Sequence, residues 1–310
     1  MLCVPELPEA ETIARQLRVE VLGAVIAGAS VQRALSVRPH TPRQFAALVR
    51  GQAVTDVRRR GKCPLLRLGD DRWLIVRLGM SGRLLVSNGR NARPPHTRVT
   101  LRLRDGRELR FVDPRAFGWL SFDRHADPHA LSALSRLGPE PLSCGFTPDT
   151  LAKALAGRRA GIERVLIAGR AVAGIGKIYA DEICFRARIH PETPAGRLTA
   201  RQIQRLYQAT REVLAQAIKH CGTSAADRAY VDSYGSTGNF QNFLNVYQRT
   251  GKPCKVCGAR IRRVPLGRGR GIHFCPRCQP APRHGSRGSD APPSRRRECR
   301  GTHGTPRMSF

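Results

Sequence analysis

The 310-residue sequence contains no run of about 18 apolar residues, the length that a membrane-spanning helix needs. Its first residues, MLCVPELPEAE, lack the basic and apolar segments of a secretory signal. Acidic residues are scarce, with 23 Asp and Glu against 54 Lys and Arg. These absences argue against a membrane-spanning or secreted protein, and we expect a cytoplasmic one.

The excess of positive charge predicts a polyanionic partner. The net charge is +31, of which the segment 280–310 contributes only +5, from seven Arg against Asp290 and Glu298. About +26 therefore belongs to the rest of the chain. Such a charge predicts nucleic acid as the partner ahead of an anionic membrane surface. The segment 280–310 is rich in Pro, Gly, Ser and Arg, which predicts a disordered basic tail.

The ten Cys residues do not form a disulfide pattern, because six are scattered and four are clustered. The cluster is CKVC at 254–257 and CPRC at 275–278, with 17 residues between the two pairs. This spacing predicts one structural Zn²⁺ in a small ribbon that has little core of its own, so that the metal would supply its folding energy. Five Arg lie between the pairs and suit contact with phosphate. The predicted ligands are Cys254, Cys257, Cys275 and Cys278.

The remaining sequence divides into two regions of different periodicity. Residues 5–22 predict a helix, and short alternating stretches from about 25 to 125 predict strands, with a hairpin turn at Asp105-Gly106. From about 147 to 220 the pattern is helical. The clearest helix has Thr199 as its N-cap and Gly222 at its C-terminal end. We therefore expect a β-rich domain followed by a helical one.

Three motifs suggest chemistry but allow a plain structural interpretation. In AGIGKIYADE (173–182), two Gly permit a tight turn into a helix near Lys177, whose N-terminus could bind phosphate or could be only a turn. LGMSG (78–82) and FVDPRAFG (111–118) read as strand ends and turns. Their Met, Arg and Phe side chains could instead enter a duplex and fill the space left by an extruded base.

Nine segments in their order of occurrence resemble the bacterial formamidopyrimidine-DNA glycosylase family, which excises oxidised purines. They are PELPEAET, RRRGKCPLL, LGMSG, DPRAFG, LGPEPL, AGIGKIYADE, FRARIHP, VYQRTGKPCKVCG and GRGIHFCPRCQ. The resemblance covers residues 5 to about 279 and implies an α+β multidomain monomer that acts on double-stranded DNA with oxidised bases or abasic sites. The implied parts are an N-terminal β-sandwich with a leading helix (5–125), a linker (126–146), a helix-two-turn-helix domain with a lesion-recognition loop (147–250), a zinc finger (251–279) and the tail (280–310).

The resemblance also implies a DNA glycosylase and AP lyase that uses a proline amine, a base with a pKa near about 8. Pro5 would attack C1′ of the damaged nucleotide and form a Schiff base, and Glu6 would protonate the opening sugar. Glu9, in the same helix start, would be a supporting carboxylate for Pro5 and Glu6. Lys62 matches the β-elimination residue, and Arg270 the zinc-finger arginine that assists δ-elimination. The implied DNA contacts are Met80, Arg115 and Phe117 in the vacated stack, His96 and Arg158 on the backbone, and Lys177.

Four positions depart from the family pattern. Lys177 stands where the family has Asn, and Glu163 aligns with a family Lys. An Asp-Gln pair is replaced by Ala168-Gly169, and Ala116 replaces an Arg. We expect Glu163 and Lys177 to form a pair that restores the local charge.

Pro5 is not the first residue of the sequence, and an internal proline nitrogen is an amide without a nucleophilic lone pair. Because Val codons include the alternative start GTG, we expect translation to begin at Val4, read as Met, and Met removal to expose Pro5. Two alternatives stay open. The chain could be a non-catalytic damaged-DNA-binding paralogue if Pro5 stays internal, or an endonuclease VIII-like enzyme for oxidised pyrimidines.

Overall fold

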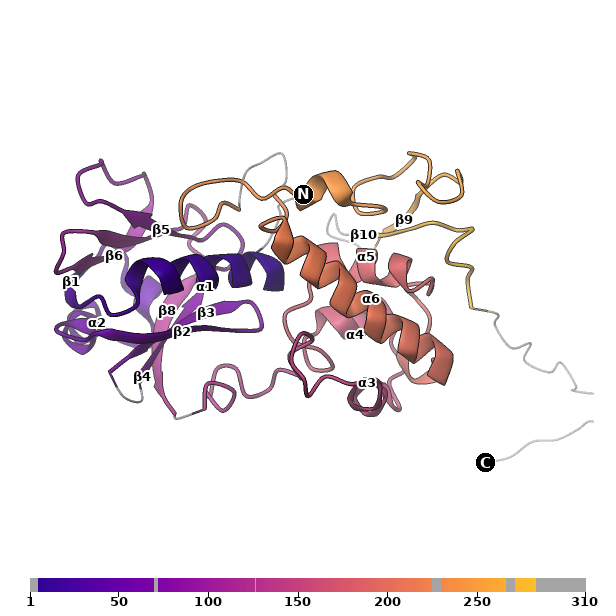
Figure 1. Ribbon diagram of the computed structural model, residues 1–310, viewed down its shortest axis with the longest axis horizontal. Helices are drawn as coiled ribbons and strands as arrows, with labels where there is room; N and C mark the ends of the chain where they lie inside the picture. Colours follow the sequence, from indigo (N-terminus) through magenta and orange to yellow (C-terminus); the bar gives the residue numbers. More distant parts are fainter. Residues whose placement is uncertain (1–4, 70–71, 126, 225–229, 266–270, 283–310) are drawn as a thin grey trace, which may run out of the picture.

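The computed structural model describes residues 5–69, 72–125, 127–224, 230–265 and 271–282. These residues form two lobes side by side (Figure 1). The N-terminal lobe holds two four-stranded sheets, and the second lobe is helical and has a two-stranded hairpin at its edge. Helix α1 extends from the sheets toward the helical lobe. The predicted α+β architecture with a β-sandwich and a helical domain is confirmed.

Helix α1 (Leu7–Val21) connects the two hydrophobic cores. Its buried face repeats at helical spacing, as the apolar pattern of the sequence predicts. Leu7, in the first turn, packs into the core of the helical lobe, whereas Ile13, Leu17 and Val21 pack into the core of the β-lobe. The N-terminus of the helix is therefore placed at the boundary between the lobes.

The β-lobe is a sandwich of two antiparallel sheets, with strand orders β1-β6-β7-β5 and β2-β3-β4-β8. The hairpin expected at Asp105-Gly106 joins β6 and β7, with Gly106 at a φ of +89°. A short helix, α2, and the 3-10 helix η1 lie beside the sheets. The elements are β1 (Ile26–Val31), η1 (Ala34–Val37), α2 (Pro42–Val49), β2 (Val54–Arg60), β3 (Cys63–Leu68), β4 (Arg72–Arg77), β5 (Arg83–Ser87), β6 (Thr97–Leu103), β7 (Glu108–Val112) and β8 (Trp119–Arg124).

The helical lobe is built around α5, which is buried along almost its whole length because other elements cover it on every side. The predicted N-cap Thr199 is confirmed, since its Oγ1 accepts a hydrogen bond from the Gln202 N–H at 3.3 Å. At the other end of this helix, the left-handed conformation begins at Cys221 (φ +56°), one residue before Gly222. The elements are α3 (Pro148–Leu155), α4 (Ile162–Ile167), α5 (Lys177–Arg186), η2 (Ala195–Arg197), α6 (Ala200–Lys219) and η3 (Phe240–Phe243).

The C-terminal hairpin consists of β9 (Arg262–Pro265) and β10 (Gly271–Phe274), and β10 lies against α5. The predicted tail lies outside the described residues from position 283 onward. Among the helices of the described residues, none has the length and apolar character needed to cross a bilayer.

Candidate active site

Pro5 and Lys62 line one small cavity beside the start of α1. Its volume is about 170 Å³, and its walls come from the turn between β2 and β3 and from the ends of β4 and β8. The structure thus brings together the predicted nucleophile and the predicted elimination residue. The lining residues are Pro5, Lys62, Cys63, Arg77, Leu78, Gly79 and Trp119.

The Glu6 carboxylate lies at the N-terminus of α5. It accepts hydrogen bonds from the N–H groups of Gly176 (2.5 Å) and Ile178 (3.0 Å). A helix start offers unpaired N–H groups and partial positive charge, which attract a carboxylate from another domain. Burial raises the pKa of Glu6 to about 7, although Lys62 and the two N–H groups lower it and Glu9 adds to the rise. A carboxyl group with this pKa can donate or accept a proton near neutral pH.

Gly176 is the point at which Glu6 and Lys62 approach each other. A Cβ atom on Gly176 would overlap the Glu6 carboxyl carbon and would lie 2.6 Å from Lys62 Nζ. Only glycine leaves room for both groups. The predicted tight turn into a helix at Lys177 is confirmed. Phosphate binding at this helix start stays a prediction, because Glu6 already occupies the N–H groups of Gly176 and Ile178.

Glu9 fixes the geometry of the Glu6 backbone. One of its oxygens accepts the Glu6 N–H at 2.8 Å, and the other accepts the Tyr179 hydroxyl at 2.5 Å and the Thr223 N–H at 2.7 Å. The side chain is fully buried, and burial raises its pKa despite these hydrogen bonds. Glu9 therefore connects α1, α5 and the segment after α6. The motif AGIGKIYADE contains Tyr179, but no local pattern indicates this contact.

Two cavity residues lie outside every motif that the sequence analysis singled out. Arg77 and Trp119 are partners across β4 and β8, and the Arg77 guanidinium carbon lies 5.1 Å from the centroid of the Trp119 ring. The guanidinium carbon of Arg38 lies 4.1 Å from the same centroid. The sequence contained one indication of both residues, since Arg77 directly precedes LGMSG and Trp119 directly follows FVDPRAFG.

The two turns that carry Met80, Arg115 and Phe117 are joined through Asp113. Its two carboxylate oxygens accept the Ser81 hydroxyl (2.6 Å) and the Gly118 N–H (2.7 Å). Phe117 is 51% exposed, and the Arg115 guanidinium carbon lies 5.0 Å from its ring centroid. Met80 is half-buried on the neighbouring turn. The structure therefore places all three side chains at one end of the sandwich.

The two predicted backbone contacts lie on different lobes. His96 is exposed, has a φ of +64°, and accepts the Asp113 N–H on its backbone oxygen, so it lies beside the same turns. Arg158 lies between α3 and α4. It borders a hollow of about 400 Å³, together with Arg159 and Arg197 and with Gly157, Pro194 and Gly196.

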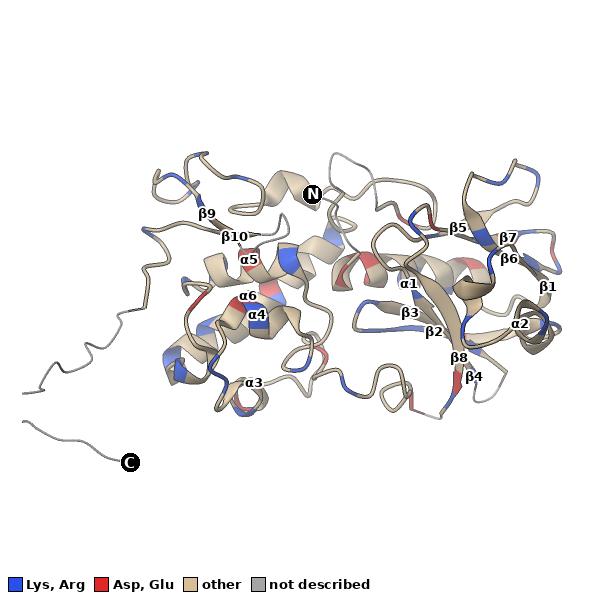
Figure 2. Ribbon diagram, turned by 180° about the vertical axis from the view of Figure 1, so that it is seen from behind, with Lys and Arg blue, Asp and Glu red and all other residues tan. Residues whose placement is uncertain are grey.

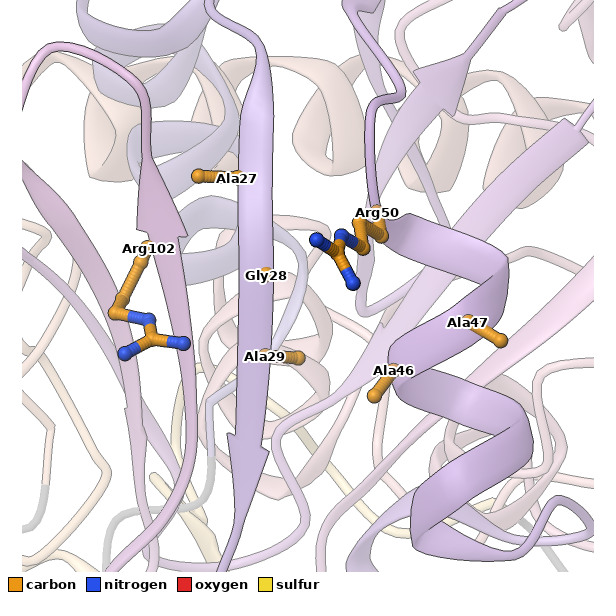
Figure 3. Close-up of a pocket in the computed structure, with 7 residues that line it drawn as sticks. All are labelled: Ala27, Gly28, Ala29, Ala46, Ala47, Arg50 and Arg102. Carbon is orange, nitrogen blue, oxygen red and sulfur yellow. The ribbon is translucent and has the colours of Figure 1, made fainter.

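A hollow of about 570 Å³ lies between β1 and α2 (Figure 3). The side chains of Arg50 and Arg102 border it, and small residues form the rest of its lining. None of the predicted site residues lies there. The complete lining is Ala27, Gly28, Ala29, Ala46, Ala47, Arg50 and Arg102.

The expected pair of Glu163 and Lys177 is present. Lys177 Nζ lies 3.0 Å from Glu163 Oε1 and also contacts an Asp181 carboxylate oxygen. The second Asp181 oxygen lies 2.9 Å from His273 Nδ1 on β10. Lys177 thus sits between two buried carboxylates in a charged chain that links α4, α5 and the C-terminal hairpin. Its predicted contact with DNA stays a prediction.

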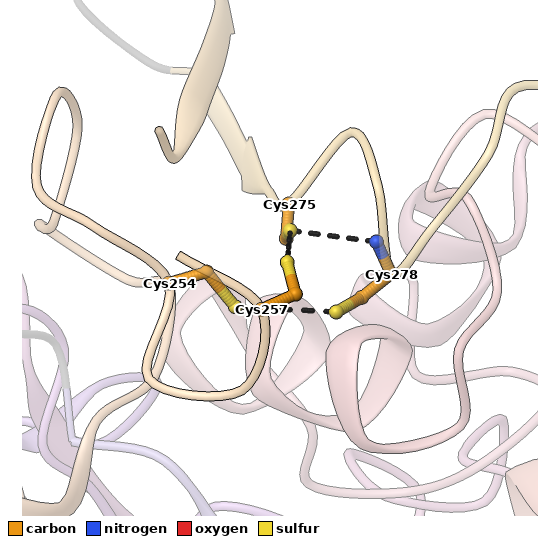
Figure 4. Close-up of side chains that lie close together, drawn as sticks. All are labelled: Cys254, Cys257, Cys275 and Cys278. Carbon is orange, nitrogen blue, oxygen red and sulfur yellow. Dashed lines mark hydrogen bonds between the residues drawn. The ribbon is translucent and has the colours of Figure 1, made fainter. Parts of the chain in front are cut away.

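The four clustered thiols form a structural zinc site (Figure 4). All four sulfur atoms lie within 4.8 Å of one another, and two of the Sγ–Sγ distances are 3.4 Å for Cys257–Cys275 and 3.9 Å for Cys254–Cys278. A tetrahedral site with Zn–S bonds of about 2.3 Å requires sulfur atoms about 3.8 Å apart. The thiols therefore fit one Zn²⁺ with no ligand position left open for catalysis.

Arg270, the predicted zinc-finger arginine, lies outside the described residues. Elsewhere, Lys and Arg are distributed over both lobes, and the acidic residues include those on α1 and around α4 and α5 (Figure 2). Several of these acids, including Glu6, Glu9 and Glu163, are buried and bound within the protein. The positive charge therefore dominates the surface.

Three family models match the chain in the order of its parts. They are the formamidopyrimidine-DNA glycosylase N-terminal domain over residues 4–120, the H2TH domain of the same glycosylase over 137–228, and a zinc finger found in FPG and IleRS over 251–281. The formamidopyrimidine-DNA glycosylase of Symbiobacterium thermophilum is 43% identical over 279 residues, which cover 90% of each chain. That of Chloroflexus aggregans is 44% identical over 277 residues, which cover 89% of this chain and 98% of the relative.

Solved structures agree with these matches. The MutM (Fpg) protein of Thermus thermophilus is 41% identical, with a TM-score of 0.79 over 89% of this chain and 98% of that one. The Lactococcus lactis Fpg in complex with DNA containing an abasic site is 33% identical, with a TM-score of 0.82 over 89% of this chain and 100% of that one. Because the glycosylases of Symbiobacterium thermophilum and Chloroflexus aggregans are 43% and 44% identical over 90% and 89% of this chain, the chain belongs to the formamidopyrimidine-DNA glycosylase family.

Proposed function

We propose that this chain excises oxidised purines from double-stranded DNA and then cleaves the resulting abasic site, with Pro5 as the nucleophile. The position of Lys62 carries the proposal, because Lys62 lines the same cavity as Pro5 and approaches the Glu6 carboxyl group at Gly176. The relatives are named formamidopyrimidine-DNA glycosylases, which favours the purine enzyme over the endonuclease VIII-like alternative.

The reaction uses covalent catalysis at C1′ of the damaged nucleotide. The Pro5 nitrogen forms a bond to C1′ as the bond to the base breaks, and opening of the sugar ring gives an iminium ion. Glu6, with a pKa of about 7, supplies the proton that the ring oxygen takes up. Lys62 assists β-elimination of the 3′ phosphate. Arg270 is proposed to assist the δ-elimination that follows.

DNA binding is assigned to both lobes. Met80, Arg115 and Phe117 are proposed to fill the stack that the extruded nucleotide leaves, because they project from two joined turns at one end of the sandwich. His96 and Arg158 are proposed to contact the phosphate backbone, together with Lys177. The zinc-bound hairpin adds Arg residues beside α5. A protein that repairs the chromosome of a bacterium is proposed to work in the cytoplasm.

The mechanism requires a free amine, so we expect the active protein to begin at Pro5. The test compares protein produced with Pro5 as its first residue and protein that retains residues 1–4, each treated with borohydride on an 8-oxoguanine:C duplex. A covalent adduct is expected from the first form only. Absence of an adduct from both forms would instead support the non-catalytic DNA-binding alternative. A parallel thymine glycol:A duplex should react more slowly, and faster reaction there would support the pyrimidine enzyme.

A further inference from the structure

The motif LGPEPL (137–142), expected to lie in a linker, packs against the turn that carries Lys62. One Glu140 oxygen accepts the Gly61 N–H at 2.7 Å and lies 2.9 Å from Arg60 Nη1. The other lies 2.6 Å from Arg59 Nη1. The Glu140 side chain is only 9% exposed, and the two arginine side chains are 8% and 5% exposed. These bonds are therefore shielded from water and from salt.

The two arginines extend the contact in both directions. Arg60 donates to the backbone oxygens of Leu137 and Gly138, each at 2.8 Å, and so binds the segment around Glu140 at three points. Arg59 Nε donates to the Glu11 carboxylate on α1 at 2.8 Å, and its Nη1 donates to the Gly61 oxygen at 3.0 Å. The turn before Lys62 is thus held to α1 and to the 137–140 segment at once.

The same segment also holds the backbone that leads to the Glu6-binding end of α5. The Gly138 N–H donates to the Gly169 oxygen at 2.9 Å, and the Ala173 N–H donates to the Pro139 oxygen at 3.0 Å. The Gly174 oxygen that follows accepts the Leu7 N–H at 3.0 Å. Residues 137–140 therefore bridge the turn of Lys62 and the turn that receives Glu6.

Both turns pack closely at this bridge. A Cβ on Gly61 would lie 2.8 Å from a methyl carbon of Leu137 and 3.8 Å from the Gly174 nitrogen, and Gly61 has a φ of +58°.

Burial alone would raise the pKa of Glu140, but Arg59, the Gly61 N–H and Arg60 outweigh it and hold the pKa below its usual value. Glu140 stays a carboxylate with both oxygens engaged by cations or N–H donors.

We propose that Glu140 is a positioning residue that sets the location of Lys62 relative to Glu6 by fixing the Gly61 turn against residues 137–140. This role rests on the proposed function of Pro5, Glu6 and Lys62. Glu140 acts through the backbone of Gly61 and through Arg59 and Arg60, and it does not contact the reacting atoms. A neutral amide of the same shape cannot replace it, because its NH₂ group would face an arginine or the Gly61 N–H.

The test compares Glu140→Gln with wild-type enzyme that begins at Pro5. Glu108→Gln is the matched control, because Glu108, like Glu140, is a buried acid that pairs with two arginines. Its partners are Arg93 and Arg110, and it lies in the sheet β1-β6-β7-β5. The measurements are zinc content, affinity for a duplex with an uncleavable abasic-site analogue, and the single-turnover rates of borohydride trapping and of β-elimination at saturating DNA against pH.

We expect Glu140→Gln to keep its zinc and to bind the duplex within about 3-fold of wild type, while its β-elimination rate falls about 10- to 100-fold, as for a misplaced catalytic group. Because Lys62 lowers the pKa of Glu6, the alkaline limb of the trapping-rate profile should move to higher pH. Glu108→Gln should lose stability without moving this limb. Adding Glu140→Gln to Lys62→Met should cause little further loss of rate.

Three outcomes would overturn the proposal. The first is a Glu140→Gln variant whose reaction rates and alkaline limb match those of wild type. The second is a Glu108→Gln variant that shows the same loss of rate and the same shift of the limb. The third is a double variant in which the rate losses of Glu140→Gln and Lys62→Met multiply in full. If Glu140→Gln does not fold, Glu140→Asp replaces it, because Asp keeps the negative charge on a shorter side chain. An alkaline limb at the wild-type pH in Glu140→Asp would also overturn the proposal. Failure of wild-type enzyme to form any adduct would instead refute the proposed function.

Discussion

Lys177 Nζ lies 3.0 Å from Oε1 of Glu163, and the Glu163 side chain is fully buried. Burial raises the pKa of this acid above its usual value, while Lys177 lowers it and the neighbouring Asp181 raises it further. Lys177 is therefore the charge that makes an ionised Glu163 tolerable inside the helical lobe. The two departures from the family pattern compensate each other in space.

Replacing Lys177 with Met should destabilise the protein by about 3–5 kcal/mol at pH 8, because it leaves a buried carboxylate unpaired. A raised folded-state pKa means that Glu163 contributes stability at low pH, which is lost as the pH rises through that pKa. Without Lys177 the pKa of Glu163 rises further, and at pH 6 a larger fraction of this side chain is protonated and uncharged than at pH 8. The variant should therefore lose less stability at pH 6 than at pH 8. Denaturant unfolding at the two pH values measures this.

Two further variants control this experiment. Adding Glu163→Gln to Lys177→Met should restore part of the lost stability, because the Glu163 charge is gone and only Asp181 still lacks its Lys177 partner. Arg186→Met breaks the exposed pair with Glu212, whose side chains are 61% and 49% exposed, and should cost less than about 1 kcal/mol. Additive losses in the double variant would show that Glu163 and Lys177 are not coupled.

The proton on Glu6 should control the rate of base excision. Since its pKa is about 7, half of the molecules hold the proton at that pH, and the protonated fraction falls above it. Single-turnover excision of 8-oxoguanine should therefore slow by about tenfold for each pH unit well above 7. Glu6→Gln should remove this limb and lower the maximal rate. A wild-type profile that stays flat from pH 6 to 9 would contradict the assignment.

Gly176→Ala should abolish activity with little change in zinc content. The new Cβ would overlap the Glu6 carboxyl group and crowd Lys62 Nζ, so that both groups must move. A displacement of this size should lower the trapping rate about 100-fold or more. Gly145→Ala is the control, since only Ser143 Oγ, at 3.9 Å, would lie within 4 Å of its Cβ. Similar rates for the two variants would argue against the geometry around Gly176.

Removing the zinc ion should weaken DNA binding while leaving the β-sandwich folded. The hairpin β9–β10 has little core of its own, and its contacts with the rest include the His273–Asp181 bond and the Gln279 amide bonded to Ile189 oxygen at 2.9 Å. We expect one zinc per chain, and at least a tenfold loss of affinity after chelation. Cys144→Ser, which changes an exposed free thiol, should keep the metal. Unchanged affinity in the metal-free protein would contradict this.

The sequence by itself determined the features that depend on near neighbours in the chain. The spacing of Cys254, Cys257, Cys275 and Cys278 is sufficient to predict the zinc site, and Thr199 to predict a helix start, because a few adjacent residues decide each one. The ordered motifs were sufficient to recognise the family. The Pro, Gly and Glu pattern of LGPEPL looked like a linker, because nothing near Glu140 in the chain indicates its partners.

Only the tertiary structure decided which side chains share a site. Glu6 reaches the N–H groups of Gly176 and Ile178, and Glu140 binds the turn before Lys62. The Trp119 ring has the guanidinium groups of both Arg38 and Arg77 close to it. Each of these contacts joins residues on separate elements. Their charge states depend on burial, which raises the pKa of Glu6 to about 7, whereas paired arginines hold the pKa of Glu140 low. Burial and pairing arise when the lobes pack together, so local sequence does not specify them.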